Sequence, residues 1–193
     1  MASTKLASFT PRRAGRRWLS ELCRAWLLAY AATWILTLAS AALLAVNPAG
    51  LDDPVRRVIG ATLDPERNPS PSIGHVLLLL AHNLPLLSWP LLLGVIGAHR
   101  RKLARQAADG LLGIVLTLNV LTVGAALGVY GLPLLAYIPQ APLEWAALAL
   151  GASGWLVQRR NPLTVDQGFV VLIGITSLLL CAAILETVAV PHR

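Results

Sequence analysis

The chain has 193 residues, of which 56% are hydrophobic and only 13% are charged, and its mean hydropathy is +0.66. A soluble domain of this size needs far more charge on its surface, so the composition predicts a protein that crosses a membrane several times. The net charge of +7 at pH 7 does not indicate a nucleic-acid-binding protein, because the basic residues lie in short segments between apolar runs.

Apolar runs follow one another along the chain, and most approach the ~20 residues that a helix needs to cross a bilayer. The fourth of them is the shortest. We therefore expect an all-α membrane protein, with a basic segment over residues 1–24 and one domain of five transmembrane helices over residues 25–193. The predicted spans are Ala25–Val46, His75–Ala98, Leu111–Gly131, Ala141–Val157 and Gly168–Val190.

The distribution of Lys and Arg predicts the orientation of these spans. Basic residues are concentrated in residues 1–24, in the connection 99–109 and at Arg159 and Arg160, whereas the two remaining connections are balanced or uncharged. Basic connections remain in the cytoplasm, so the N-terminus is expected to be cytoplasmic and the C-terminus external. A cleaved signal peptide ending near Ala39–Ala41 is the alternative interpretation of the first run.

The external connection 47–74 contains a segment with helical periodicity. Asp53 is placed to cap a helix and Pro54 to occupy its first turn. The apolar residues that follow recur at helical spacing, which predicts a short amphipathic helix over about residues 53–64, lying on the outer membrane surface.

Polar side chains from four spans are predicted to lie in the outer half of the bilayer, whereas the inner half is nearly free of them. They are His82, Asn83, Asn119, Glu144 and Glu186. Polar groups at membrane depth tend to face the interior of the bundle and to find partners there.

Several functions are compatible with this cluster. Its members could only hold helices together, or they could bind a protein partner, a peptide or a proton, with one glutamate keeping its proton because like charges repel. His82, Glu144 and Glu186 could also ligate zinc or act as a general acid–base group. No recognised hydrolase or nucleotide-binding motif supports an enzyme.

Small residues in the spans indicate close helix packing. Pro85 and Pro90 are expected to kink the second span beside His82 and Asn83. Trp145 and Trp155 are expected near span ends or along the lipid boundary. The glycines assigned to helix packing are Gly94, Gly97, Gly124, Gly128, Gly151 and Gly154.

Four segments together resemble the stage II sporulation protein M family. These are AHNLPLLSWPLLLGVIGA (81–98), LTLNVLTVGAALG (116–128), IPQAPLEWAALALGASGWL (138–156) and AAILETVAVP (182–191). Asn119, Pro139, Glu144, Glu186 and Pro191 match the family pattern. The chain departs from that pattern at Val120, which stands where the family has glycine, and at Gln140 and Ala141, which replace a usual His-Gly pair.

The resemblance implies a five-span protein of the bacterial plasma membrane with a cytoplasmic N-terminus. Members are similar to components of envelope-remodelling complexes in sporulating bacteria, and relatives accompany ABC transporters and the maturation and export of ribosomally made peptides, including bacteriocins. A small non-enzymatic subunit is therefore expected, with the lipid bilayer, membrane proteins, a peptide or a second copy of the chain as partners and with no cofactor. The alternatives are an intramembrane hydrolase or leader peptidase that uses Glu144, Glu186 and His82, with zinc, and a small proton-coupled transporter.

Overall fold

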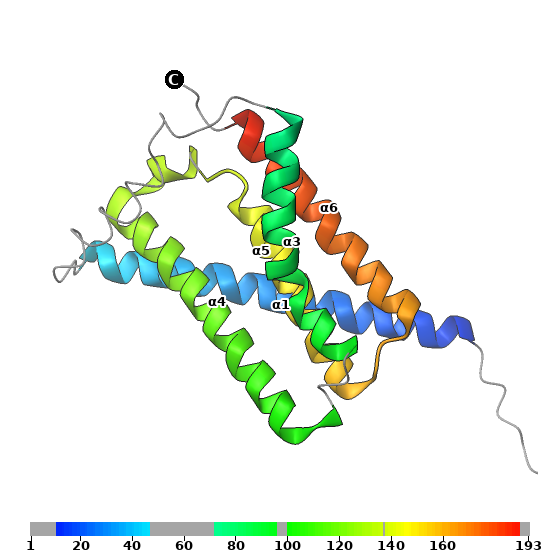
Figure 1. Cartoon of the computed structure of the whole chain (residues 1–193). Coiled ribbons are helices and arrows are strands. Elements are labelled where there is room, and N and C mark those ends of the chain that lie inside the picture. The colour runs from blue at the N-terminus through cyan, green and yellow to red at the C-terminus, as the bar shows by residue number, and fades with distance from the viewer. Residues whose placement is uncertain (1–10, 47–71, 96–99, 137, 190–193) are drawn as a thin grey trace, which may run out of the picture.

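The computed structural model describes residues 11–46, 72–95, 100–136 and 138–189, and it is built from helices throughout these ranges (Figure 1). The prediction of an all-α fold is therefore confirmed for the described chain. The elements in chain order are α1 (Pro11–Val46), α3 (Ile73–Val95), α4 (Lys102–Tyr130), the 3-10 helix η3 (Leu132–Ala136), α5 (Ala141–Arg160) and α6 (Val165–Ala189).

Four of these helices, α1, α3, α4 and α6, are long and apolar enough to cross a membrane. Large apolar side chains cover their outer surfaces, and Leu43, Leu78 and Ile173 are 71%, 67% and 63% exposed. A soluble protein does not leave so many leucine and isoleucine side chains in water. The chain is thus a multi-pass membrane protein whose exposed helix faces contact lipid.

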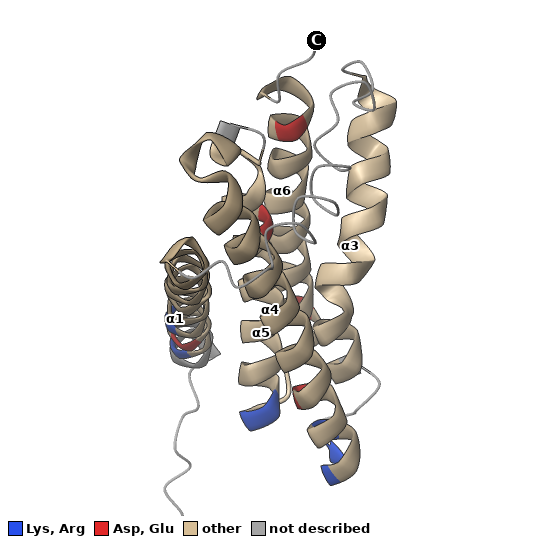
Figure 2. Cartoon of the chain, turned by 90° about the vertical axis from the view of Figure 1, so that its left-hand side faces the viewer, with Lys and Arg blue, Asp and Glu red and all other residues tan. Residues whose placement is uncertain are grey.

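The helix α5 is not among those four, and it is the core of the bundle. It lies between α1 on one side and α3 and α6 on the other (Figure 2). Its sequence is rich in alanine and glycine, and most of its residues are buried, from Ala141 to Gln158. A helix enclosed by other helices needs small side chains that allow close approach, whereas a lipid-facing helix needs large apolar ones.

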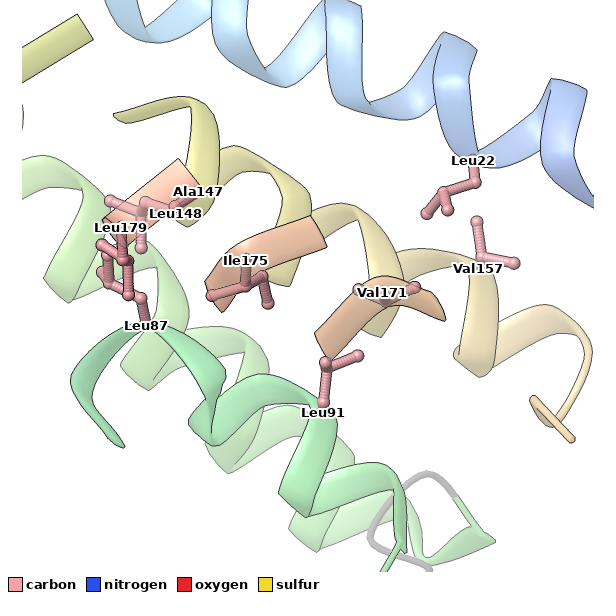
Figure 3. Packing of buried hydrophobic residues seen from close by; sticks show 9 residues of the cluster. All are labelled: Leu22, Leu87, Leu91, Ala147, Leu148, Val157, Val171, Ile175 and Leu179. Carbon is pink, nitrogen blue, oxygen red and sulfur yellow. The ribbon is translucent and has the colours of Figure 1, made fainter. Parts of the chain in front are cut away.

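Apolar side chains join the other helices to α5. Figure 3 shows Leu22 of α1 beside Val157 of α5, and Leu87 and Leu91 of α3 near the α6 residues of the same cluster. The α6 residues Val171, Ile175 and Leu179 are at most 1% exposed. Because their spacing of four residues puts them on one face of α6, the rest of that helix remains free to face lipid.

The helix α1 crosses the other helices obliquely. In Figure 2 it points toward the viewer, while α3, α4, α5 and α6 run along the page. It packs on α4 and α5, and it is continuous through Ala39–Ala41, the segment considered as a cleavage site. It also begins before residue 25, so no break in structure separates the end of the basic segment from the first span.

Local sequence signals explain two of the helix boundaries. Thr164 and Gln167 form a capping box, in which the Thr164 amide donates to Gln167 Oε1 at 3.0 Å and the Gln167 amide donates to Thr164 Oγ1 at 3.3 Å. This cap starts α6 at Val165, three residues before the expected Gly168. The second boundary is the end of α5 at Arg160, where the chain cannot continue as a helix because Pro162 follows two residues later.

The helix α3 runs from Ile73 to Val95 with Pro85 and Pro90 inside it. Both prolines are accommodated within one continuous helix. The predicted surface helix over residues 53–64 lies outside the described residues, as does Gly97.

Candidate functional site

Three of the predicted polar residues meet at the end of the bundle where α3 and α5 begin and α6 ends, which we call the acidic end. The Asn83 side-chain amide of α3 donates a hydrogen bond to Glu144 Oε1 of α5 at 3.2 Å. Glu186, near the end of α6, lies close enough to Glu144 for the two carboxylates to interact electrostatically. All three side chains are half-buried.

The start of α5 explains the position of Glu144. Pro142 occupies the first turn, and the backbone amide of Glu144 donates to the Gln140 carbonyl at 3.1 Å. Glu144 is itself in this first turn, where the helix dipole favours a negative charge. Its carboxylate is therefore stabilised by its own helix and by Asn83 of a neighbouring helix.

His75 is a member of the cluster that the sequence reasoning missed. It is half-buried in the first turn of α3, and it interacts electrostatically with Glu186. The apolar pattern marks it only as the first residue of a predicted span. The available signal was its spacing: eight residues before Asn83, it lies about two turns away along α3, toward the end of the bundle where α6 terminates.

His82 and Asn119 do not join the other predicted residues. The His82 side chain is exposed on α3. Asn119 donates through Nδ2 to the Val115 carbonyl of its own helix at 2.9 Å. Within the described residues no group of three His, Cys, Asp or Glu side chains is placed to hold a metal ion, so the trio proposed for zinc is not assembled there.

Gln140 occupies the position at which the resemblance places a histidine. Its side-chain carbonyl oxygen is buried and accepts no hydrogen bond from the described part of the chain. A buried acceptor without a donor is costly. The acidic end therefore combines two carboxylates with an unpaired acceptor four residues before Glu144.

A second polar cluster lies at the opposite end of the bundle, where α4 begins and α5 ends, which we call the basic end. Asp109 Oδ1 of α4 accepts a hydrogen bond from Trp155 Nε1 at 2.9 Å and forms an ion pair with Arg159 at 3.2 Å. Asp109 precedes the predicted start of the third span at Leu111, but it belongs to helix α4, which begins at Lys102.

The predicted position of two tryptophans is corrected by the structure. Trp145 and Trp155 are only 4% and 1% exposed, so neither lies along the lipid boundary. Trp155 packs against Ala108 and Leu112 of α4, and Trp145 packs on Trp34 of α1 in a tilted arrangement, with ring centroids 4.6 Å apart. Both indoles belong to α5, which is enclosed by other helices.

The glycines allow close contacts between helices. A Cβ atom at Gly124 would lie 2.7 Å from Ser40 Cβ of α1, and one at Gly128 would lie 2.9 Å from the Ala41 carbonyl oxygen. Gly151 faces the Leu87 backbone and Gly154 faces Leu91, both on α3, in the same way. Gly94 lies directly beneath the side-chain amide of Gln158.

Comparison of the chain with models of protein families, with curated proteins and with solved structures finds no match.

Proposed function

We propose that the chain is a small multi-pass subunit of the bacterial plasma membrane that acts with protein partners. The process would be envelope remodelling, or the export and maturation of a peptide. The resemblance of segments 81–98, 116–128, 138–156 and 182–191 to stage II sporulation protein M supports this class of function.

The observation that carries the proposal is the excess of acidic groups at the acidic end. Among the described side chains, Glu144 accepts only from the neutral Asn83 amide, and every Lys and Arg whose side chain is described belongs to α1, the start of α4 or the end of α5. Carboxylates at membrane depth are normally paired. A binding surface for a partner segment that brings a donor or a positive charge accounts for this imbalance.

Photo-crosslinking in bacterial membranes tests this proposal. A photoreactive residue replaces Leu143, which is half-buried beside Glu144, and a second one replaces Leu77, which is 57% exposed on α3. We expect a protein adduct of defined mass from position 143 only, and its loss in the double variant Glu144→Gln and Glu186→Gln. An adduct that persists without the two charges, or that forms equally at position 77, would contradict the proposal.

The presence of His75 at the same end of the bundle as Glu144 and Glu186 favours one second candidate, an intramembrane hydrolase or leader peptidase. A carboxylate, a second carboxylate and an imidazole could transfer protons to and from a bound peptide. Purified protein should then cleave a peptide substrate, and cleavage should be lost in both Glu186→Gln and His75→Gln. Metal analysis of the same samples would show whether zinc takes part.

A further inference from the structure

At the basic end, the Lys and Arg residues outnumber the Asp and Glu residues that could balance their charge. The cations are Arg100, Arg101, Lys102 and Arg105 around the start of α4, with Arg159 and Arg160 in the last turn of α5. Figure 2 shows these Lys and Arg residues of α4 and α5 gathered at one end of the bundle. The acidic residues described at this end of the α4, α5 and α6 bundle are Asp109 and the exposed Asp166.

Asp109 is already engaged by two donors. It holds Trp155 Nε1 at 2.9 Å and Arg159 at 3.2 Å, and apolar packing of Ala108, Leu112 and Trp155 surrounds this junction. The start of α4 and the end of α5 are therefore fixed against each other. Their basic side chains are held in one place rather than spread over independent loops.

Arg105 is the half-buried member of these six cations. It lies one helical turn before Asp109 and three residues before the buried Ala108, so it is on the packed side of α4 rather than on the lipid-facing side. Its side chain is half-buried, and none of the described carboxylates forms an ion pair with it. Asp109, which pairs with Arg159 of α5, lies one turn further along the same face of α4.

Membrane topology alone does not explain this placement. Retention of basic segments in the cytoplasm requires only that Lys and Arg lie near the span ends, and any face of the helix would serve. A half-buried guanidinium between two helices is favourable when an anion accompanies it. Basic sites between transmembrane helices at headgroup level are the ones that hold acidic lipid headgroups.

An apolar side chain beside Arg159 suits the rest of a lipid. Leu156, one turn earlier on α5, is 43% exposed. An acyl chain can lie against it while the headgroup stays beside the two arginines. We propose that the basic end binds the phosphate of an anionic phospholipid, with Arg105 and Arg159 as its ligands.

Native mass spectrometry of the full chain in detergent, supplied with equal amounts of phosphatidylglycerol and phosphatidylcholine, tests this site. We expect selective retention of phosphatidylglycerol, and a decrease of about fivefold in Arg105→Gln, which is the effect of one basic residue beside an anionic surface. Arg105→Lys, which keeps the charge, should retain part of the selectivity, and added salt should weaken it.

Arg17→Gln is the matched control, since it removes the same charge from an exposed α1 residue that pairs with Glu21 at 3.3 Å. It should leave lipid retention unchanged. Equal retention of the two lipids by the natural chain overturns the proposal without any variant. An equal loss in Arg105→Gln and Arg17→Gln also overturns it, because the effect would then follow net charge and not this site.

Discussion

Asp109 shows how much of the bundle depends on a single carboxylate. Its Oδ1 atom accepts from both Trp155 and Arg159, so it links α4 to α5 through a hydrogen bond and an ion pair. Trp155 is 1% exposed, and its indole N–H has no access to water. The contact therefore satisfies two groups that would otherwise be left unpaired.

The variant Trp155→Phe removes the indole N–H while keeping an aromatic ring. We expect it to lower the free energy of unfolding by about 1–3 kcal/mol, because a hydrogen bond to a charged acceptor is lost and a small void is left. Thermal or denaturant unfolding in detergent measures this. Trp89→Phe is the control: Trp89 packs at the same junction, and none of the described hydrogen bonds involves its indole, so its loss should be clearly smaller.

Two substitutions of Glu144 distinguish the effect of its charge on stability from the effect of its hydrogen bond. Glu144→Gln keeps an oxygen that can accept from Asn83 Nδ2, so its unfolding free energy should stay within about 0.5 kcal/mol of the natural chain or rise. Glu144→Leu leaves the Asn83 amide without that acceptor, and stability should fall by about 1–3 kcal/mol. If the leucine variant were the more stable of the two, the carboxylate would be destabilising and would be retained for binding alone.

The polar cluster shows what the sequence could predict at this scale. Depth follows from position along a span, and Asn83 and Glu144, two residues predicted at similar depth, form a hydrogen bond in the structure. The direction of a side chain around its helix depends on which neighbours pack against it, and a uniformly apolar span carries almost no signal for this. For that reason the sequence favours His82, although the structure leaves His82 exposed and it is the half-buried His75 that interacts electrostatically with Glu186.

Among the helices, α5 is the one whose sequence was hardest to interpret. Its alanines, glycines and serine lower its hydropathy, and its apolar run is the shortest of the predicted spans. The same residues make it the most enclosed helix of the structure, with Ala147, Ser153 and Trp155 at most 1% exposed. Hydropathy measures how well a helix suits a lipid environment, and a helix that is surrounded by protein need not be strongly apolar.

The backbones of α5 and α3 come close together at Gly151. A Cβ atom there would lie 2.5 Å from the Leu87 carbonyl oxygen, and a backbone atom cannot move aside without shifting its helix. Gly151→Ala should therefore destabilise the protein by about 1–3 kcal/mol, as overpacked cores do. Unfolding in detergent, monitored by helix content, is the measurement.

Gly113 of α4 is the control for that substitution, since nothing lies within 4 Å of a Cβ atom placed there. Gly113→Ala should leave stability unchanged or raise it slightly, because alanine is the better helix former. Equal effects of the two substitutions would mean that helix propensity, and not the contact with Leu87, determines the outcome.

At the scale of the whole molecule, the oblique course of α1 is what the sequence did not predict. The number and approximate limits of the long helices follow from apolar runs and Lys and Arg positions. The tilt of a helix depends on side-chain contacts at each crossing. For α1 these are Trp26 Nε1 donating to the Ala146 carbonyl at 2.8 Å, and Ser40 and Ala41 against the α4 glycines.

The topology of the molecule depends on whether α5 crosses the membrane, because η3 and the connection to α6 lie at the two ends of this helix. Single cysteines can be placed on either side of it, at Leu132, which is 77% exposed, and at Asn161, which is also exposed. The background for both is the chain with Cys23→Ser and Cys181→Ala, which removes its two free cysteines.

A membrane-impermeant maleimide applied to intact cells should label Leu132→Cys, whereas Asn161→Cys should react only after permeabilisation. The reason is that Asn161 follows Arg159 and Arg160, and basic span ends remain on the cytoplasmic side. The opposite pattern would mean that the molecule has the inverse orientation. The acidic end, with the proposed partner surface, would then lie in the cytoplasm. Labelling of both positions in intact cells would mean that α5 does not cross the membrane, and that its enclosed position reflects packing between the four lipid-facing helices alone.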